Sequence, residues 1–558
     1  MVTAALVAAV AVLVVLILPP APLALPTPFF DATVPGILHV HTNRSDGRGT
    51  PDEVATAAAK AGLKFIVITD HGDGTRVSDP PVYRAGVLCI DAVEISTSDG
   101  HYLALGMTPA PYPFNGEGRD VVEDVNRLGG FGVVAHPESP KSTLAWRAWD
   151  TPFDAIEWVN PDTSWRVFLH DGWRSRITLI GALATYPFRP EASIARLLGD
   201  TSLGLERWNA MTRARRVIVL AGADAHANLA LGSGDSTTTG LSVPIPSYQA
   251  SFGTLSVHAR PSHELSGEPE GDAAAVLAAL RRGHAYVAID GFASPPAFEF
   301  TAIGSDRSVE EGDEIPADSP VTLRVRSNAP ATFTTVIWQD DHRLMTYAGG
   351  AERRRVVTAP GAYRVEIDRA ASVPWLISNP IYVGGWPHPI PAERRSASAS
   401  QALFDGRTAV GWATEVDPRS MAAVEMGEGG KGLQLHYALG GGTSSGQFVA
   451  LVTRLPRPNR YDRLALTAHS EDPMRISVQL RTPDPGSARW QRSIYLDQHD
   501  REYTIDFGEM TAVADPAGPR LDPREVRDLL IVIDTTHTKP GAKGRLWITR
   551  AVLERSAP

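Results

Sequence analysis

Histidines and carboxylates in the first half of the chain have types and spacings that suit a metal centre. His39 and His41 are two positions apart within the strand-like residues 37–41, so both side chains project from one face of that strand. Two imidazoles on one face can bind the same metal ion. With 16 His in 558 residues, a random chain contains roughly 0.5 such pairs, so the pair alone is weak evidence for a metal site.

Further candidate ligands stand where predicted strands end. They are Asp70 and His71 after residues 65–68, Glu94 at the end of residues 87–93, His136 after residues 131–135, and Asp224 and His226 after residues 217–221. Parallel strands bring their carboxyl ends to one rim, which is where α/β barrels carry their active sites. The placement therefore predicts that these side chains meet in one metal site.

Together these residues resemble the metal centre of the PHP family, the polymerase and histidinol phosphatase family of metal-dependent phosphoesterases. The similar motifs are His39-x-His41, Ser45-Asp46-Gly47, Thr69-Asp70-His71, Glu94, Gly100-His101-Tyr102-Leu103, Ala135-His136-Pro137 and Asp224-x-His226. The resemblance implies a metal-ligand set of His39, His41, Asp46, His71, Glu94, His101, His136, Asp224 and His226. It also implies a distorted seven-stranded β/α barrel over residues 36–295 and two or three divalent metal ions.

The order of the chain's parts is similar to one branch of this family. A barrel followed by a sandwich containing Trp375-Leu376-Ile377-Ser378-Asn379-Pro380-Ile381-Tyr382 resembles the branch that includes carbaryl hydrolase. That branch implies a carbamate or carboxylic ester as the alternative to a phosphoester substrate. Zinc, manganese and iron all accept a mixture of imidazole and carboxylate ligands, so the metal stays open.

The charge of such a centre predicts its chemistry. Asp46, Glu94 and Asp224 bring three negative charges, whereas two or three divalent cations bring about +4 to +6, so the pocket would be positive. We expect a small anionic or ester substrate and hydrolysis by a metal-activated water. Glu94, Asp224 and Asp70 are the predicted catalytic residues, with Asp70 orienting a ligand or accepting the proton of the water.

The elements that must position this centre alternate between strands and helices. Residues 37–41 are followed by Thr50 as a helix N-cap, Pro51 at the first helical position and Glu53 at the third, and the helix ends at Gly62 before the apolar residues 65–68. The alternation continues through residues 217–221 and predicts an α/β fold with a parallel sheet. Residues 164–216 fit this pattern only loosely.

Beyond residue 295 the pattern changes to β. Residues 321–326 alternate strictly between apolar and polar, as do residues 363–367, which is typical of antiparallel strands. We therefore expect an Ig-like β-sandwich over residues 296–384, a linker over 385–400 and a second β-sandwich over 401–558. The last resembles a galactose-binding-like jelly roll, in which Trp412, Trp490 and Trp547 are available to a carbohydrate, although core positions are the commoner place for such residues. A non-catalytic envelope glycan-binding protein is thus the alternative of another class.

The N-terminus and the overall composition indicate where the protein works. Residues 4–18 are uninterruptedly apolar and precede several prolines, so residues 1–26 are predicted to be a signal peptide or an N-terminal membrane anchor. Either one predicts export to the periplasm or cell envelope, with membrane contact through this segment alone. A net charge of −10 argues against nucleic acid as a partner. The single cysteine, Cys89, excludes disulfides within the chain.

Overall fold

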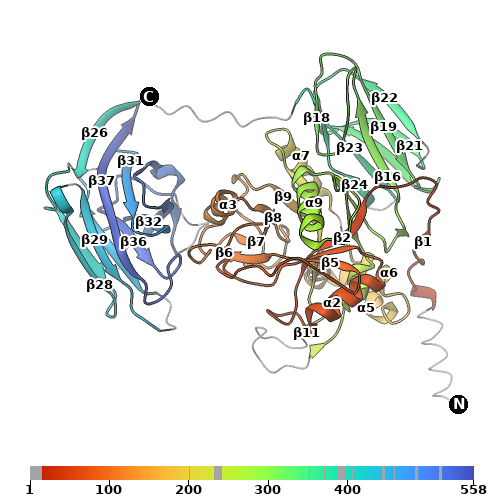
Figure 1. Ribbon diagram of the computed structural model, residues 1–558, viewed down its shortest axis with the longest axis horizontal. Coiled ribbons are helices and arrows are strands. Elements are labelled where there is room, and N and C mark those ends of the chain that lie inside the picture. Colours follow the sequence, from red (N-terminus) through yellow and green to blue (C-terminus); the bar gives the residue numbers. More distant parts are fainter. Residues whose placement is uncertain are drawn as a thin grey trace. The chain divides into compact units, whose positions relative to one another are not determined.

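The computed structural model describes residues 15–557 with gaps (Figure 1). The gaps are residue 200 and residues 231–241, 351, 370–372, 386–395, 405, 431, 443–445, 458, 484–487, 515–517 and 519. Contacts divide the chain into two units, which we describe separately. The first comprises residues 1–72, 77–108 and 122–390, and the second comprises residues 73–76, 109–121 and 391–558.

A closed barrel forms the first part of the first unit. Its ring of strands is β2 (Val34–Val40), β3 (Phe65–Ile68), β6 (Val93–Thr97), β7 (Gly100–Leu105), β8 (Phe131–Val134), β9 (Ala155–Val159) and β10 (Ile218–Ala225). Strands β8, β9, β10, β2 and β3 pair in parallel, and β6, β7 and β8 pair antiparallel. A parallel bridge between His71 and Glu94 joins the end of β3 to β6. The ring is thus closed next to two of the predicted metal ligands.

The predicted strand over residues 87–93 is divided between two strands in the structure. β5 (Val87–Asp91) pairs with β3 and with β4 (Val82–Arg84), whereas β6 pairs with β7. The chain changes partner at Ala92, whose N–H still donates to the carbonyl of Ile68. The local pattern does not reveal this change, because Ile90 before Ala92 and Ile95 after it are both buried.

Helices cover the barrel strands. α2 (Pro51–Lys60) begins with the predicted capping box, in which Thr50 and Glu53 satisfy each other's backbone N–H groups. α3 spans Gly118–Arg127, α8 spans Tyr248–Phe252, and α9 (Pro269–Arg282) ends at Gly283, whose φ of 73° needs a glycine. The loosely predicted residues 164–216 are helical, with α4 (Pro161–His170), α5 (Gly172–Thr185), α6 (Pro190–Ala195) and α7 (Ser202–Thr212).

The first sandwich shares a sheet with the barrel. β13 (Ser256–Ala259) pairs with β2, and the same sheet runs through β14 (Ala285–Ala288) to β24 (Pro374–Ser378), β23 (Gly361–Asp368), β20 (Thr334–Gln339) and β21 (His342–Ala348). β25 (Ile381–Val383) and β18 (Glu314–Ile315) extend it. The structure therefore differs from the predicted boundary at residue 295, because backbone pairing between β14 and β24 continues across it.

The other sheet of the first sandwich carries the predicted alternation. It contains β17 (Ser308–Glu310), β16 (Phe298–Ile303), β19 (Val321–Ser327) and β22 (Arg353–Val357), in that order. In β16 and β19 every second side chain is buried. Two short strands elsewhere in the first unit, β11 (Leu229–Ala230) and β12 (Ser242–Val243), pair with each other.

Two six-stranded sheets form the sandwich of the second unit, drawn from cyan to blue in Figure 1. One contains β26 (Ala397–Phe404), β28 (Met421–Met426), β29 (Leu433–Ala438), β31 (Arg463–Ser470), β34 (Arg501–Asp506) and β37 (Lys543–Ser556). The other contains β27 (Trp412–Val416), β30 (Phe448–Arg454), β32 (Met474–Arg481), β33 (Arg489–Leu496), β35 (Thr511–Ala512) and β36 (Asp528–Asp534). Residues 397–400 of the predicted linker belong to β26 and pair with β37, and residues 386–395 lie outside the described residues.

A buried cluster of charges, the Asp120 cluster, lies within the second unit. Asp120 belongs to the segment 109–121 of that unit, and its Oδ1 accepts hydrogen bonds from Arg475 at 3.0 Å and Arg492 at 2.8 Å. Arg475 also donates to Ser493, and nearby Glu117 accepts from Thr511 at 2.8 Å. Because Arg475 and Asp120 are almost fully buried, each relies on the other for compensation of its charge.

The N-terminal segment makes defined backbone contacts. β1 (Leu23–Ala24) pairs in parallel with β15 (Ala293–Ser294), and the side chain of Asn328 donates to the carbonyl of Pro26. Residues that the sequence places in a signal peptide or anchor therefore take part in the fold of the first unit. Among the helices that the structure describes, none has the length and apolar character needed to cross a membrane.

Candidate metal centre

Glu94, on β6, lies at the middle of the predicted ligands. Its Oε2 is 3.1 Å from His39 Nε2, 3.0 Å from His41 Nε2 and 3.5 Å from His71 Nδ1. Its Oε1 is 2.7 Å from His101 Nδ1 and 3.1 Å from His136 Nε2. The carboxylate is buried, and each of its two oxygens faces a different set of imidazoles. A carboxylate in this position can bridge two cations.

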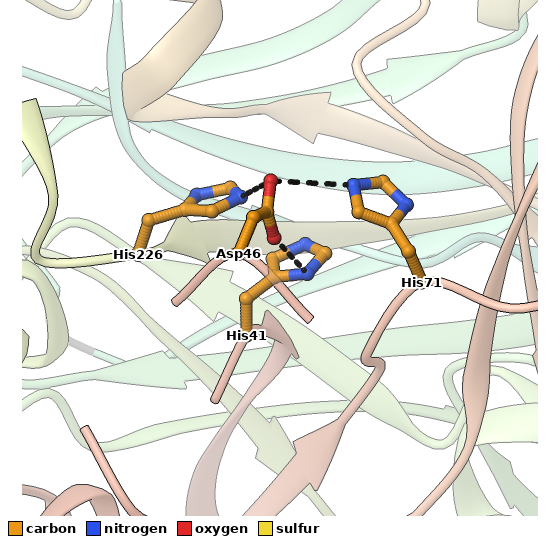
Figure 2. A group of neighbouring side chains, drawn as sticks. All are labelled: His41, Asp46, His71 and His226. Atoms are coloured by element: carbon orange, nitrogen blue, oxygen red, sulfur yellow. Dashed lines mark ion pairs between the residues drawn. The ribbon is translucent and has the colours of Figure 1, made fainter. Parts of the chain in front are cut away.

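A second group lies around Asp46, in the loop after β2. Figure 2 shows the carboxylate of Asp46 between three imidazole rings. One oxygen is 3.2 Å from His226 Nε2 and 3.6 Å from His71 Nε2, and the other is 3.4 Å from His41 Nδ1. The Asp46 side chain is 35% exposed, unlike that of Glu94. Asp46 therefore marks a side of the cluster that water can reach.

Asp224, at the end of β10, joins the two groups. Its Oδ1 is 3.3 Å from His39 Nε2, 3.5 Å from His41 Nε2 and 3.5 Å from His226 Nδ1. All nine predicted ligands fall into four overlapping sets whose donor atoms lie within 4.8 Å of one another. The sets are His41, Asp46, His71 and His226; His39, His41 and Glu94; His39, His136 and Asp224; and His71, Glu94 and His101.

Three of these side chains sit on strained backbone. The φ angles of His39, His136 and Asp224 are 62°, 30° and 46°. Non-glycine residues rarely adopt positive φ, and such strain concentrates at functional sites. Each of the three lies near the carboxyl end of a barrel strand, and each contributes to the donor sets. The fold thus accepts local strain in order to bring these donors together.

The contacts among the donor atoms leave a buried nitrogen without a hydrogen bond, and a bound cation would satisfy it. His41 Nε2 is buried and makes no hydrogen bond, although two carboxylate oxygens lie within 3.5 Å of it. A buried polar atom without a partner is unfavourable unless a ligand satisfies it. Imidazole nitrogens and carboxylate oxygens at this spacing are the donor types that Zn²⁺, Mn²⁺ and Fe²⁺ accept. The residues present therefore fit a multinuclear metal site.

The pKa values show how strongly negative this cluster is. Burial alone would lower the pKa of His39, but the charges of Glu157, Asp224 and Glu94 outweigh burial and raise the pKa well above its usual value. Burial likewise opposes the shift at His226, where Asp224 and Asp46 raise the pKa to about 9. In the absence of a cation, protons on imidazoles balance the carboxylates.

The carboxylates shift in the opposite direction. Burial would raise the pKa of Glu94, yet the charge of His39 and hydrogen bonds from His101 and His136 hold it well below its usual range. The pKa of Asp46 is also lowered, against the effect of burial, by His226 and His71. Both groups are therefore ionised and available to a metal at neutral pH.

Asp70 is placed beside the cluster rather than among its donors. Its Oδ1 accepts from the Thr42 N–H at 2.7 Å and from Ser45 Oγ at 2.6 Å, and its Oδ2 accepts from Thr42 Oγ1 at 2.6 Å. These contacts hold the loop that carries His41 and Asp46. Asp70 thus lies where it can position this loop, and its catalytic role stays a prediction.

Tyr248 holds the same loop from the other side. Its hydroxyl lies 2.8 Å from the carbonyl oxygen of His41 and 3.0 Å from that of His226, and it accepts the N–H of Gly49. Because one hydroxyl contacts the backbone at two ligands, α8 fixes the relative position of His41 and His226. The sequence offered no signal for this role, since Tyr248 lies far from both histidines in the chain.

Glu157 is the main positioning residue that the ligand motifs do not include. Its Oε1 is 2.6 Å from His39 Nδ1, while its Oε2 accepts the His136 N–H at 2.7 Å and the Asn160 side chain at 3.0 Å. A carboxylate on the far nitrogen of a metal-binding histidine fixes the ring and its tautomer. Gly222 makes room, because a Cβ there would lie 1.8 Å from Glu157 Oε1.

The three tryptophans that the sequence makes available to a carbohydrate lie in different surroundings. Trp412 and Trp490 are buried in the core of the second sandwich, the commoner place for such residues, and neither forms an exposed sugar platform. Trp547 stacks on His469 with ring centroids 4.8 Å apart. A cavity of about 730 Å³ lies in the second unit, with Trp412, Glu415, Arg481 and Asp528 among its lining residues.

Comparison with known proteins gives partial likenesses. No family model matches the chain. A 3',5'-nucleoside bisphosphate phosphatase of Chromobacterium violaceum is 35% identical over 79 residues, which are 13% of this chain and 28% of that protein. The chain thus spans about 28% of the length of this curated relative.

Solved structures match it more broadly but at low identity. A two-domain protein of Bacteroides vulgatus containing a predicted PHP-like metal-dependent phosphoesterase is 13% identical, with a TM-score of 0.30, over 65% of this chain and 98% of its own. A family 11 carbohydrate-binding module of a Clostridium thermocellum cellulase is 16% identical, with a TM-score of 0.24, over 29% of this chain and 97% of its own.

Proposed function

We propose that the first unit is a PHP-type metal-dependent phosphoesterase. One observation carries this proposal: nine imidazole and carboxylate donors, delivered by separate strands and loops of a closed barrel, converge around Glu94. The 79-residue likeness to a phosphatase supports the same chemistry. The ring of β2, β3 and β6 to β10 agrees with the distorted seven-stranded barrel that the resemblance implies.

Two or three divalent cations held by these donors would supply an activated water and neutralise the charge of a phosphoester. The chain's own residues prepare the site for this. Glu94 presents its two oxygens to different imidazole sets, and Glu157 fixes the ring of His39 from the far nitrogen. Asp224 lies against three histidines and stays ionised, because the charges of His39 and His226 lower its pKa despite burial.

The proposed substrate is a small phosphoester, and a phosphomonoester is the first class to test. The more exposed part of the cluster, around Asp46, His71 and His226, is where a soluble substrate can approach. A cation-loaded pocket in a chain of net charge −10 would attract the phosphate locally. A carbamate or carboxylic ester is the alternative, because the same donors would polarise a carbonyl.

A substrate screen on the full chain tests this function. The protein is stripped of metal, reloaded separately with Zn²⁺, Mn²⁺ or Fe²⁺, and assayed on phosphomonoesters, phosphodiesters, carboxylic esters and carbamates. We expect metal-dependent release of phosphate from at least one phosphoester. Hydrolysis of carbonyl compounds alone would contradict the phosphoesterase proposal, and it would leave the metal centre in place.

The second unit carries a separate proposal, a carbohydrate ligand in its cavity. Arg481 bonds to Glu415 at 2.7 and 2.8 Å and to Asp528, so the polar groups lining the cavity are held in fixed positions. Fixed hydrogen-bonding groups beside an open cavity suit a polyhydroxylated ligand. Titration of the full chain with soluble glycans, followed by calorimetry, tests this, with Glu415→Ala as the variant expected to lose binding.

We also propose that the protein acts outside the cytoplasm, because residues 4–18 form an apolar run of export or anchor type. Cell fractionation and sequencing of the mature N-terminus test this localisation. Recovery of the whole protein in the cytosolic fraction would contradict it.

A further inference from the structure

Helix α5 (Gly172–Thr185) exposes a row of large apolar side chains. Trp173, Ile177 and Ile180 are 68%, 57% and 65% exposed, and their spacing of four and three residues places them on one helix face. Ala182 and Thr185, on the opposite face, are buried. Isolated exposed apolar residues are common on soluble proteins, but a contiguous row of this kind marks a binding surface.

Neighbouring elements extend this row. Val167 and Leu169 on α4, Leu183 on α5 and Phe188 after it are also exposed, and α4 contacts α5. Together with Trp173, Ile177 and Ile180 they form what we call the hairpin patch. The patch is carried by α4, α5 and the residues that follow α5. Burial of such side chains is worth roughly 25 cal/mol per Å², so leaving them in water is unfavourable.

Arginines flank the hairpin patch. Residues 171–189 contain Arg174, Arg176 and Arg189 against one carboxylate, Asp171, in a protein whose net charge is −10. Arg174 lies over the ring of Trp173, with its guanidinium carbon 5.5 Å from the ring centroid. An apolar row with a tryptophan and flanking arginines is the composition of helices that lie in a membrane interface.

The end of the N-terminal apolar run lies beside the same helices. Arg196, at the end of α6, donates to the carbonyl of Ile17 at 3.1 Å, and Arg189 donates to the carbonyl of Pro19. Ile17 belongs to the run over residues 4–18, the stretch that suits lipid or a signal peptidase, and Pro19 follows that run directly. The last residues of the apolar run that the structure describes therefore lie beside α6, which follows Phe188 of the hairpin patch.

We propose that the hairpin patch lies on the surface of a lipid bilayer, with its arginines toward anionic headgroups. Trp173, Ile177 and Ile180 enter the interface, while Arg174 and Arg176 stay at headgroup level. This adds a second membrane contact to the one expected through the N-terminal segment alone. It does not depend on the metal centre or on the proposed phosphoesterase activity.

A site-specific label on the full chain tests the proposal. Cys89 is buried, and burial raises the pKa of its thiol to about 11, so a thiol-reactive fluorophore will label a new exposed cysteine instead. Ile177→Cys places the label in the hairpin patch. Val410→Cys is the matched control, because Val410 is 84% exposed and lies in the second sandwich. Both labelled proteins are mixed with vesicles of phosphatidylcholine containing phosphatidylserine.

The expected result is a blue shift of the Ile177→Cys label, and its quenching by nitroxide lipids, with no change at Val410→Cys. Membrane attachment through residues 4–18 alone would leave position 177 in water and would overturn the proposal. A label at position 177 that is already shielded from water in the absence of vesicles would also overturn the proposal. Persistence of that shielding on dilution would identify the chain's own N-terminal segment as the occupant, and its loss would identify a second copy.

The arginines give a second readout. Arg174→Gln with Arg176→Gln should weaken binding to phosphatidylserine vesicles by about fivefold per arginine. The control is Arg353→Gln with Arg355→Gln, which removes two equally exposed arginines from β22. An equal loss in both double variants would mean that net charge alone governs binding, and this would overturn the assignment to the hairpin patch.

Discussion

The metal centre of the first unit and the Asp120 cluster of the second are both buried and both charged, yet their charges are compensated differently. Glu94, Asp46 and Asp224 contact imidazoles, which are positive only when protonated. Asp120 contacts Arg475 and Arg492, which stay positive at every physiological pH. The charge of Asp120 is compensated by permanent cations of the chain itself, whereas the imidazoles of the metal centre provide compensation that a bound cation can replace.

This difference separates a structural cluster from a functional one. The guanidinium groups of Arg475 and Arg492 offer hydrogen-bond donors only, so they cannot coordinate a metal. Imidazoles and carboxylates offer lone pairs, and positive φ at His39, His136 and Asp224 adds strain that a purely structural cluster does not need. Variants in the two clusters should therefore separate activity from stability.

The largest expected effect is the loss of a metal ligand. His41 belongs to two of the four donor sets, so His41→Ala should lower hydrolytic activity by about a thousandfold or more. Circular dichroism should show an unchanged fold. The exposed His342→Ala is the control and should keep full activity. Full activity in His41→Ala with unchanged metal content would contradict the assignment of this residue.

The corresponding change in the Asp120 cluster should act on stability instead. Asp120→Ala leaves Arg475 buried without its carboxylate and should destabilise the second unit by about 3–5 kcal/mol in urea unfolding. Hydrolytic activity per folded molecule should be unchanged. Asp500→Ala removes an exposed ion pair and should change stability by about 1 kcal/mol or less.

A second substitution that restores the lost stability makes this test more specific. Adding Arg475→Met to Asp120→Ala removes the uncompensated charge and should recover much of the lost stability. If Asp120→Ala were as stable as the parent protein, the cluster would not hold the second unit, and the comparison with the metal centre would fail.

A smaller effect is expected from Glu157, which touches a ligand rather than the metal. Glu157→Gln should weaken metal affinity by about 10–100-fold, because the carboxylate orients His39. Gly222→Ala should act in the same direction, since its Cβ would displace that carboxylate. Metal titration of each variant measures this, with the exposed Glu206→Gln as the control. Unchanged affinity in both variants would remove the positioning role.

The smallest expected effect is the change in metal affinity caused by one pH unit. The pKa of His226 is raised from 6.5 to about 9, so its contribution to the stability of the metal-free protein is full below pH 6.5 and is lost as pH rises through 9. Metal must displace this proton, so apparent affinity should rise with pH by about tenfold per unit for each proton released, up to about pH 9. Metal titrations between pH 6 and 10 test this, and a flat profile would contradict it.

The sequence allowed much of the metal centre to be predicted, because the ligands follow strands whose apolar runs are unambiguous. His136 after residues 131–135 and Asp224 after residues 217–221 are examples. The positioning residues were not predictable in the same way. Glu157 is one acidic residue in an apolar strand, and the sequence does not tell whether it faces the rim or the core.

Strand pairing was harder to predict where the paired strands lie far apart in the sequence. Whether residues 87–95 form one strand or two depends on β3 and β7, which local pattern does not specify. The continuity of β14 with β24 and the pairing of β26 with β37 likewise join residues far apart in the chain. Residues 164–216 form helices with exposed apolar faces, so their hydrophobic pattern does not point to a core.

The central claim is that scattered imidazoles and carboxylates converge into one multinuclear metal centre. Elemental analysis of the purified full chain after saturation with Zn²⁺ or Mn²⁺ and removal of free ions tests it most directly, with Glu94→Gln measured in parallel. We expect two or three equivalents of metal per chain in the parent protein and fewer than one in Glu94→Gln. Well under one equivalent in the parent protein would contradict it.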